Sequence, residues 1–143
     1  NCLSDYFALG MHELKNSADN LSSLTSRGFK FISLQQIVSR RELTFDQAVD
    51  QAKDYVLASN KYIGIELDLD SISFMPASAY TNAGISLSDA QFYVHSLATL
   101  TKSCYLHLAE GAPQQHPGGL SAGMSDIGQG LASLVTSFIQ AKQ

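Results

Sequence analysis

Strand-like and helix-like segments alternate along all 143 residues of this chain. Short apolar runs predict strands near residues 6–11, 29–33, 62–70 and 104–109. Each run is followed by apolar residues at helical spacing, and Thr44-Phe-Asp-Gln47 has the form of a capping box. Such alternation is typical of a parallel sheet covered by helices. The sequence therefore predicts a three-layer α/β/α fold with a mainly parallel sheet of about four strands, in which residues 1–143 form a single α/β domain.

The composition is that of a globular protein, with 45% apolar and 15% charged residues. A net charge of −4 offers no basic surface for nucleic acid, and no apolar run reaches the ~18 residues of a membrane span. Cys2 and Cys104 are too few and too far apart for a disulfide framework, and Cys104 is expected to be a buried free thiol. We therefore expect a cytoplasmic protein that binds neither nucleic acid nor membrane. Because the chain begins at Asn1 rather than Met, we also expect it to be part of a longer or processed polypeptide.

The third predicted strand ends in two carboxylates, Asp68 and Asp70. Residues two apart in a strand point to the same side, and sites in parallel α/β sheets lie at the carboxyl ends of the strands. Carboxylate oxygens suit hard divalent cations such as Mg²⁺, Ca²⁺ and Mn²⁺. The pair therefore predicts half of a metal site; the alternative is that these acids only cap the next turn.

Three further residues lie where they could contribute to the same edge. Glu110 closes the fourth predicted strand, and its carboxylate could hold a cationic guanidinium or amidinium group, or else be a solvated loop acid. Glu66 is on the same side as Asp68 but deeper in the strand, where a buried acid needs a partner. His107 on the next strand is the candidate partner. We therefore predict that Glu66 and His107 are a supporting pair behind the metal ligands.

Several signatures of catalysis are missing from the sequence. It has no Gly-x-Ser-x-Gly nucleophile elbow, no phosphate-binding P-loop and no His-x-x-x-His or Asp-x-His-x-Asp metal pattern. We therefore assign no catalytic residue within this chain.

The acidic strand and the segments after it resemble the arginase, agmatinase and formimidoylglutamase family, the ureohydrolases. The resemblance lies in Glu66-Leu-Asp-Leu-Asp-Ser-Ile72, Pro76-Ala-Ser, Ala83-Gly-Ile-Ser86 and Leu108-Ala-Glu-Gly-Ala-Pro113. It implies that Asp68 and Asp70 are ligands of a binuclear Mn²⁺ centre, and that Glu110 contacts the guanidino or formimidoyl group of a small-molecule substrate. It also implies that Thr81 shapes the substrate side of the site. The implied reaction is hydrolysis of a C–N bond, with formimidoylglutamase-like chemistry favoured.

The chain lacks two other segments of that family pattern, Gly-Gly-x-His and Asp-x-His-x-Asp, and the family's catalytic domain is about twice as long. The resemblance therefore implies the C-terminal half of a ureohydrolase, inactive alone. A half-domain leaves a sheet edge that needs covering, so we expect self-association or pairing with an N-terminal half.

Two alternatives remain from the sequence. A haloacid-dehalogenase-like phosphatase also uses an Asp-x-Asp motif after an apolar strand, but there the motif follows the first strand. A non-catalytic α/β binding or assembly module would keep the sheet without the metal centre.

Overall fold

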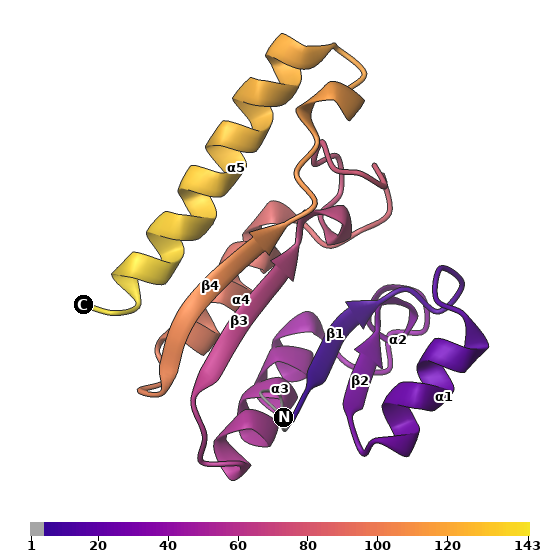
Figure 1. Cartoon of the computed structure of the whole chain (residues 1–143), viewed down its shortest axis with the longest axis vertical. Helices are drawn as coiled ribbons and strands as arrows, with labels where there is room; N and C mark the ends of the chain where they lie inside the picture. Colours follow the sequence, from indigo (N-terminus) through magenta and orange to yellow (C-terminus); the bar gives the residue numbers. More distant parts are fainter. Residues whose placement is uncertain (1–4) are drawn as a thin grey trace. The chain divides into compact units, whose positions relative to one another are not determined.

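The computed structural model describes residues 5–143 and divides the chain into two compact units, Asn1–Lys61 and Tyr62–Gln143. Each unit contains one two-stranded parallel sheet with its own helices (Figure 1). The predicted α/β class and the parallel strand pairing are confirmed. The four predicted strands are all present, as two pairs. The single domain over residues 1–143 stays a prediction.

In the first unit, strand β1 (Phe7–Met11) pairs in parallel with β2 (Lys30–Ser33). Helix α1 (Ala18–Ser26) connects them and begins at the Ser17 cap. It is followed by Gly28 at φ 75°, a left-handed conformation that suits glycine. A short helix that the sequence reading did not find, α2 (Leu34–Val38), then starts from its own capping box.

Helix α3 (Phe45–Ala58) completes the first unit. The Thr44 side chain accepts from the Gln47 N–H, and the Gln47 side chain accepts from the Thr44 N–H, so the predicted capping box is confirmed. The face of α3 that carries the helical apolar repeat is buried at Phe45, Ala48, Val49 and Ala52.

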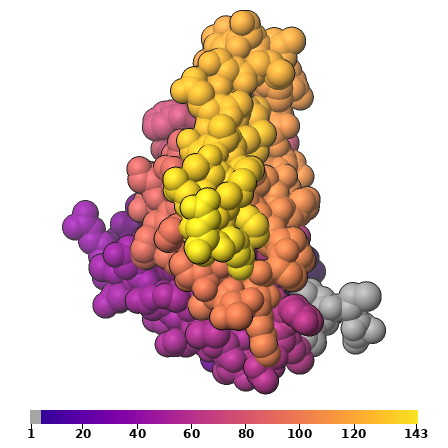
Figure 2. Space-filling model, turned by 90° about the vertical axis from the view of Figure 1, so that its left-hand side faces the viewer, coloured from indigo at the N-terminus to yellow at the C-terminus, as the bar shows by residue number. Residues whose placement is uncertain are grey.

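In the second unit, β3 (Ile63–Asp68) pairs in parallel with β4 (Ser103–Ala109). The 3₁₀ turn η1 (Leu69–Ser71), a long loop and helix α4 (Leu87–Ala98) connect the two strands. After β4 the chain passes through a second 3₁₀ turn, η2 (Pro113–Gln115), into helix α5 (Leu120–Gln140). Helices α4 and α5 pack against each other and against the strands. Figure 2 shows α5 exposed along one side of this unit.

Burial alternates along β3 and decides which side chains remain available for a site. Ile63, Ile65 and Leu67 are buried, whereas Glu66 and Asp68 on the other side of the strand are exposed. The expectation that Glu66 is buried is therefore wrong, and so is the same expectation for Cys104. His107, the predicted partner of Glu66, is exposed as well. The reason is that only one face of this strand pair supplies the core.

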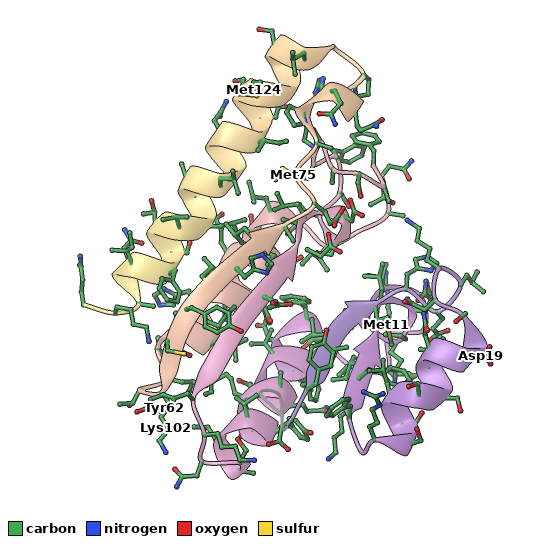
Figure 3. The ribbon with its side chains drawn as sticks, in the orientation of Figure 1. Met11, Asp19, Tyr62, Met75, Lys102 and Met124 are labelled. Carbon is green, nitrogen blue, oxygen red and sulfur yellow. The ribbon has the colours of Figure 1, made fainter. Side chains whose placement is uncertain are left out.

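The loop between η1 and α4 is tied to the rest of the unit by close packing. Its Met75 is buried and lies beside α5 (Figure 3). A Cβ atom at Gly130 of α5 would lie 2.6 Å from the Met75 Cε atom, so the close packing of Met75 on this helix depends on a glycine at position 130. None of the helices within residues 5–143 combines the length and the apolarity needed to cross a membrane.

Candidate functional site

The carboxyl end of β3 turns at Asp68. The Asp68 Oδ1 atom accepts from the backbone N–H of Asp70 at 2.9 Å, and the Ser71 hydroxyl donates to the Asp68 carbonyl at 2.6 Å. Asp68 therefore caps η1, as the capping alternative predicts, while its Oδ2 atom receives no hydrogen bond from the described residues. Asp70 lies beyond the strand, so the argument from strand alternation is wrong for it: the turn, and not the pleat, sets its direction.

Asp70 and Glu110 are joined through Ser78. The Ser78 Oγ atom lies 2.6 Å from Glu110 Oε2 and 3.2 Å from Asp70 Oδ2. The other oxygen of Asp70, Oδ1, accepts from the backbone N–H of Ala79 at 2.9 Å. The predicted neighbours Asp70 and Glu110 thus converge on one hydroxyl group.

The backbone holds the loop at Ser78 against the chain that follows β4. The Ser78 N–H donates to the Glu110 carbonyl at 3.0 Å, and the Ala112 N–H donates to the Pro76 carbonyl at 2.9 Å. An antiparallel bridge between Ala77 and Gly111 lies between these bonds. Glu110 itself has φ 67°, a left-handed conformation that costs a non-glycine residue about 1 kcal/mol. The turn at Glu110 is therefore held by its surroundings.

Negative charge is concentrated at this edge of the sheet. Partial burial raises the pKa of Asp68, and the negative charges of Asp70 and Glu110 add to that rise, while the hydrogen bond from the Asp70 N–H opposes it. No Lys, Arg or His side chain in the described part of the chain forms an ion pair with any of these three carboxylates. We call Asp68, Asp70 and Glu110, with Ser78, the acidic cluster.

The donor set suits a hard cation but is not a complete metal centre. Within residues 5–143, no group of three or more His, Cys, Asp or Glu side chains is arranged to hold a metal ion. The Asp68 Oδ2 atom accepts no hydrogen bond from the described residues. Each oxygen of Asp70 accepts one hydrogen bond and keeps a second lone pair, so Asp68 and Asp70 can both still bind a cation. The residues therefore fit two carboxylate ligands of a larger centre, and the remaining ligands are not among those described.

The other predicted site residues lie close by in different roles. The His107 Nδ1 atom is 3.1 Å from Glu66 Oε1, so the predicted pair forms, with both side chains about 60% exposed. Thr81 Oγ1 accepts from the Ala83 N–H at 3.1 Å, and the Thr81 carbonyl accepts from the Phe74 N–H at 2.8 Å. Thr81 thus shapes the loop that carries Ser78; its contact with substrate stays a prediction.

The sequence reading missed Ser78. The only signal for it was its place after Pro76-Ala77 in a motif of the resemblance. Its contacts depend on Glu110, which lies 32 positions further along the chain. A lone serine in a polar loop gives no indication of such a partner.

No family profile and no curated protein sequence matches the chain. Solved structures do match it. Formimidoylglutamase from Bacillus subtilis superposes with a TM-score of 0.75 at 14% identity, covering 95% of this chain and 41% of that one. Arginase from the same organism gives 0.74 at 16% identity, with 92% and 42% covered. Agmatine ureohydrolase of Thermoplasma volcanium gives 0.64 at 17% identity, with 92% and 41% covered.

The chain therefore spans about two-fifths of the length of these enzymes. At identities below 20%, these matches establish a shared fold. That fold is the one that the sequence resemblance predicted. Over the part that it covers, the chain has the fold shared by formimidoylglutamase, arginase and agmatine ureohydrolase, the ureohydrolases.

Proposed function

We propose that this chain is the C-terminal portion of a ureohydrolase that cleaves a C–N bond in a guanidino or formimidoyl substrate. Asp68 and Asp70 are two ligands of its Mn²⁺ centre, and Glu110 contacts the cationic group of the substrate. The observation that carries the proposal is the acidic cluster itself. Three carboxylates gather at the carboxyl edge of β3 and β4, no cationic side chain of the described residues pairs with them, and the fold is that of the ureohydrolases.

The substrate follows from the charge and the open oxygens of the cluster. A guanidinium or amidinium group is planar and cationic, and it donates parallel hydrogen bonds to a carboxylate. Glu110 uses Oε2 for Ser78 and leaves Oε1 open to such a donor. Formimidoylglutamase and arginase superpose about equally well, with TM-scores of 0.75 and 0.74, so our preference for formimidoylglutamate rests on the sequence resemblance.

The chain alone is expected to be inactive. Two carboxylates hold Mn²⁺ weakly, and the described residues bring no third ligand to them. The remaining ligands, and the histidine that would act as a general acid, are expected from an N-terminal portion carrying Asp-x-His-x-Asp. The cytoplasmic location also belongs to this proposal.

Paramagnetic NMR tests the metal assignment on this chain even if binding is weak. Mn²⁺ titrated into the ¹⁵N-labelled chain should first broaden the amide signals of residues 68–71 and 110. The isosteric double variant Asp68→Asn, Asp70→Asn should lose that broadening, because it removes both charges and keeps the shape. The double variant Glu13→Gln, Glu42→Gln, which removes two acids of the first unit, should keep it.

Broadening that survives the Asp68→Asn, Asp70→Asn substitution would contradict the assignment, as would no broadening near residue 68. In either case the non-catalytic module becomes the better interpretation. Hydrolysis is then measured on the longer polypeptide that the proposal requires, with formimidoylglutamate, arginine and agmatine compared as substrates. Release of formamide or urea, lost in the same double variant, is the expected result.

A further inference from the structure

We propose that Ser78 is a positioning residue, whose hydroxyl group fixes the Glu110 carboxylate for a planar cationic ligand. The inference rests on the proposed function, because it deepens the role given there to Glu110. It starts from the two short contacts of one hydroxyl oxygen, 2.6 Å to Glu110 Oε2 and 3.2 Å to Asp70 Oδ2.

A serine hydroxyl has one proton, so it donates one strong hydrogen bond. The shorter contact identifies Glu110 Oε2 as the principal acceptor, with Asp70 Oδ2 at the longer distance. The two carboxylates therefore both lie within hydrogen-bonding distance of one hydroxyl oxygen. Asp70 is also held by the Ala79 N–H, whereas the Glu110 side chain has no other hydrogen bond among the described residues. Without the Ser78 hydroxyl, repulsion from Asp70 should therefore turn the Glu110 carboxylate towards solvent.

Ser78 can set this direction because its own backbone is fixed at both ends. Its N–H donates to the Glu110 carbonyl, and the preceding residue, Ala77, is fully buried and bridged to Gly111. The following residue, Ala79, donates its N–H to Asp70 Oδ1. The backbone around Ser78 is therefore hydrogen-bonded to Glu110 and to Asp70, the two residues that its hydroxyl group contacts.

The orientation matters for the ligand rather than for the fold. Ser78 and Glu110 are both exposed, so their hydrogen bond is not part of the core. Losing it therefore leaves no buried polar atom unpaired. The hydrogen bond occupies Oε2 and fixes the plane of the carboxylate. The orientation of Oε1, which accepts no hydrogen bond from the described residues, is fixed with it. A guanidinium or amidinium group pairs with a carboxylate through parallel hydrogen bonds of defined geometry, so a fixed carboxylate plane should favour such a ligand.

The test compares Ser78→Ala with Ser78→Thr and Ser71→Ala in the whole chain. Threonine keeps the hydroxyl group. Ser71→Ala is a matched control, since the Ser71 hydroxyl lies in the adjoining turn η1 and donates to the Asp68 carbonyl and not to a carboxylate. Two properties are measured: the side-chain couplings of Glu110, which report its rotamer, and its carboxyl carbon shift during titration with acetamidinium chloride.

We expect one Glu110 rotamer in the unchanged chain, averaging over several in Ser78→Ala, and recovery in Ser78→Thr. Apparent acetamidinium affinity should fall about fivefold in Ser78→Ala, the effect of one net hydrogen bond, with the urea midpoint unchanged. Ser71→Ala should leave both the rotamer and the affinity as they are.

An unchanged Glu110 rotamer in Ser78→Ala would overturn the inference, and so would an equal change in Ser71→Ala. The outcome is separable from that of the proposed function. Mn²⁺ broadening near residue 68 should persist in Ser78→Ala, so its presence with an unaltered Glu110 rejects the positioning role alone. If Mn²⁺ broadening is absent from the unchanged chain, the metal assignment fails, while the rotamer measurement still decides the role of Ser78.

Discussion

Each unit of this protein contains one cluster of carboxylates with a serine hydroxyl, and the two clusters differ in their positive charge. In the first unit, Arg40 reaches both oxygens of Glu13, at 2.7 and 3.0 Å, and its Nε atom donates to Glu42. The Ser33 hydroxyl donates to Glu13 as well. We call Glu13, Ser33, Arg40 and Glu42 the arginine network. The acidic cluster of the second unit has three carboxylates and a serine, but no arginine.

The difference shows in the pKa values of the acids. The Arg40 guanidinium, with help from the Ser33 hydroxyl, lowers the pKa of Glu13 to about 2. In the acidic cluster, partial burial and the neighbouring carboxylates raise the pKa of Asp68 instead. In the arginine network, the positive charge of Arg40 pairs with the negative charges of Glu13 and Glu42 within the same unit. The acidic cluster has no such side-chain cation among the described residues, and the proposed function assigns that place to a metal ion and a cationic substrate.

The clusters also differ in what holds them, which gives the largest expected effect. The arginine network depends on side chains, whereas the acidic cluster depends on a folded loop in which Gly84 passes close to Ser71. A Cβ atom at Gly84 would lie 2.2 Å from the Ser71 carbonyl oxygen. Gly84→Ala should therefore lower the free energy of unfolding by about 2 kcal/mol and displace the loop that carries Asp70 and Ser78.

The matched control is Gly128→Ala. Gly128 lies inside α5 with open space around its missing Cβ atom, so alanine there should raise the stability by up to about 1 kcal/mol through helix propensity. Urea unfolding of the two variants gives both numbers. Equal effects of the two substitutions would show that the loop at Gly84 is loose, and that the acidic cluster has no fixed geometry.

Removing the cation from the arginine network should make it resemble the acidic cluster. In Arg40→Gln, the pKa of Glu13 should rise from about 2 towards its ordinary value of 4.5. Because the folded pKa is depressed, the stability that Glu13 contributes is complete above about pH 4.5 and is lost as the pH falls towards 2. The unfolding midpoint of the unchanged chain should therefore fall over this range, and that of Arg40→Gln should fall less.

Because the charged side chains of the network, Glu13, Arg40 and Glu42, are 36–46% exposed, the loss near neutral pH should be smaller than that of Gly84→Ala. Arg41→Gln is the control, since the Arg41 side chain forms no ion pair within residues 5–143. A Glu13 carboxyl titration by NMR that is the same in Arg40→Gln and in the unchanged chain would mean that Arg40 does not set its charge.

Local sequence patterns predicted most of the fold. The apolar runs located all four strands, and the capping box at Thr44 located the start of α3. Helix α2 was missed because five residues are too few to show a helical repeat. Burial on β3 was misjudged because the alternation of strands and helices predicted a sheet covered on both faces. Along β3 the buried Ile63, Ile65 and Leu67 alternate with exposed residues, the pattern of a strand buried on one side.

The acids of the site were predictable and their connection was not. Asp68 and Glu110 end neighbouring parallel strands, and that rule needs only the order of the strands. The path of the loop could not be predicted from the order of the strands. It is fixed by the bridge between Ala77 and Gly111 and by the hydrogen bond from the Ile85 N–H to the Ser71 carbonyl. Contacts between segments so far apart leave no periodic signal, and Ser78 was missed for that reason.

The smallest expected effect concerns His107, on the exposed face of β3 and β4. His107 lies opposite Glu66 in the strand register, whereas Asp68 lies opposite Ala109, two residues further along β4. If His107 lent positive charge to the acidic cluster, the contrast between the two clusters would be smaller than proposed. We expect instead that His107→Gln changes the free energy of unfolding by less than about 0.5 kcal/mol, because both partners of the pair are largely exposed.

Mn²⁺ broadening near residue 68 should then have the same concentration dependence in His107→Gln as in the unchanged chain. Glu66→Gln is the partner control, because it removes a negative charge from the same face and keeps His107. A several-fold change in the Mn²⁺ concentration required in either variant would make the Glu66–His107 pair part of the site, as the sequence predicted. An unchanged requirement would confine the site to Asp68, Asp70 and Glu110 and leave the pair as an ordinary cross-strand contact of an exposed sheet face.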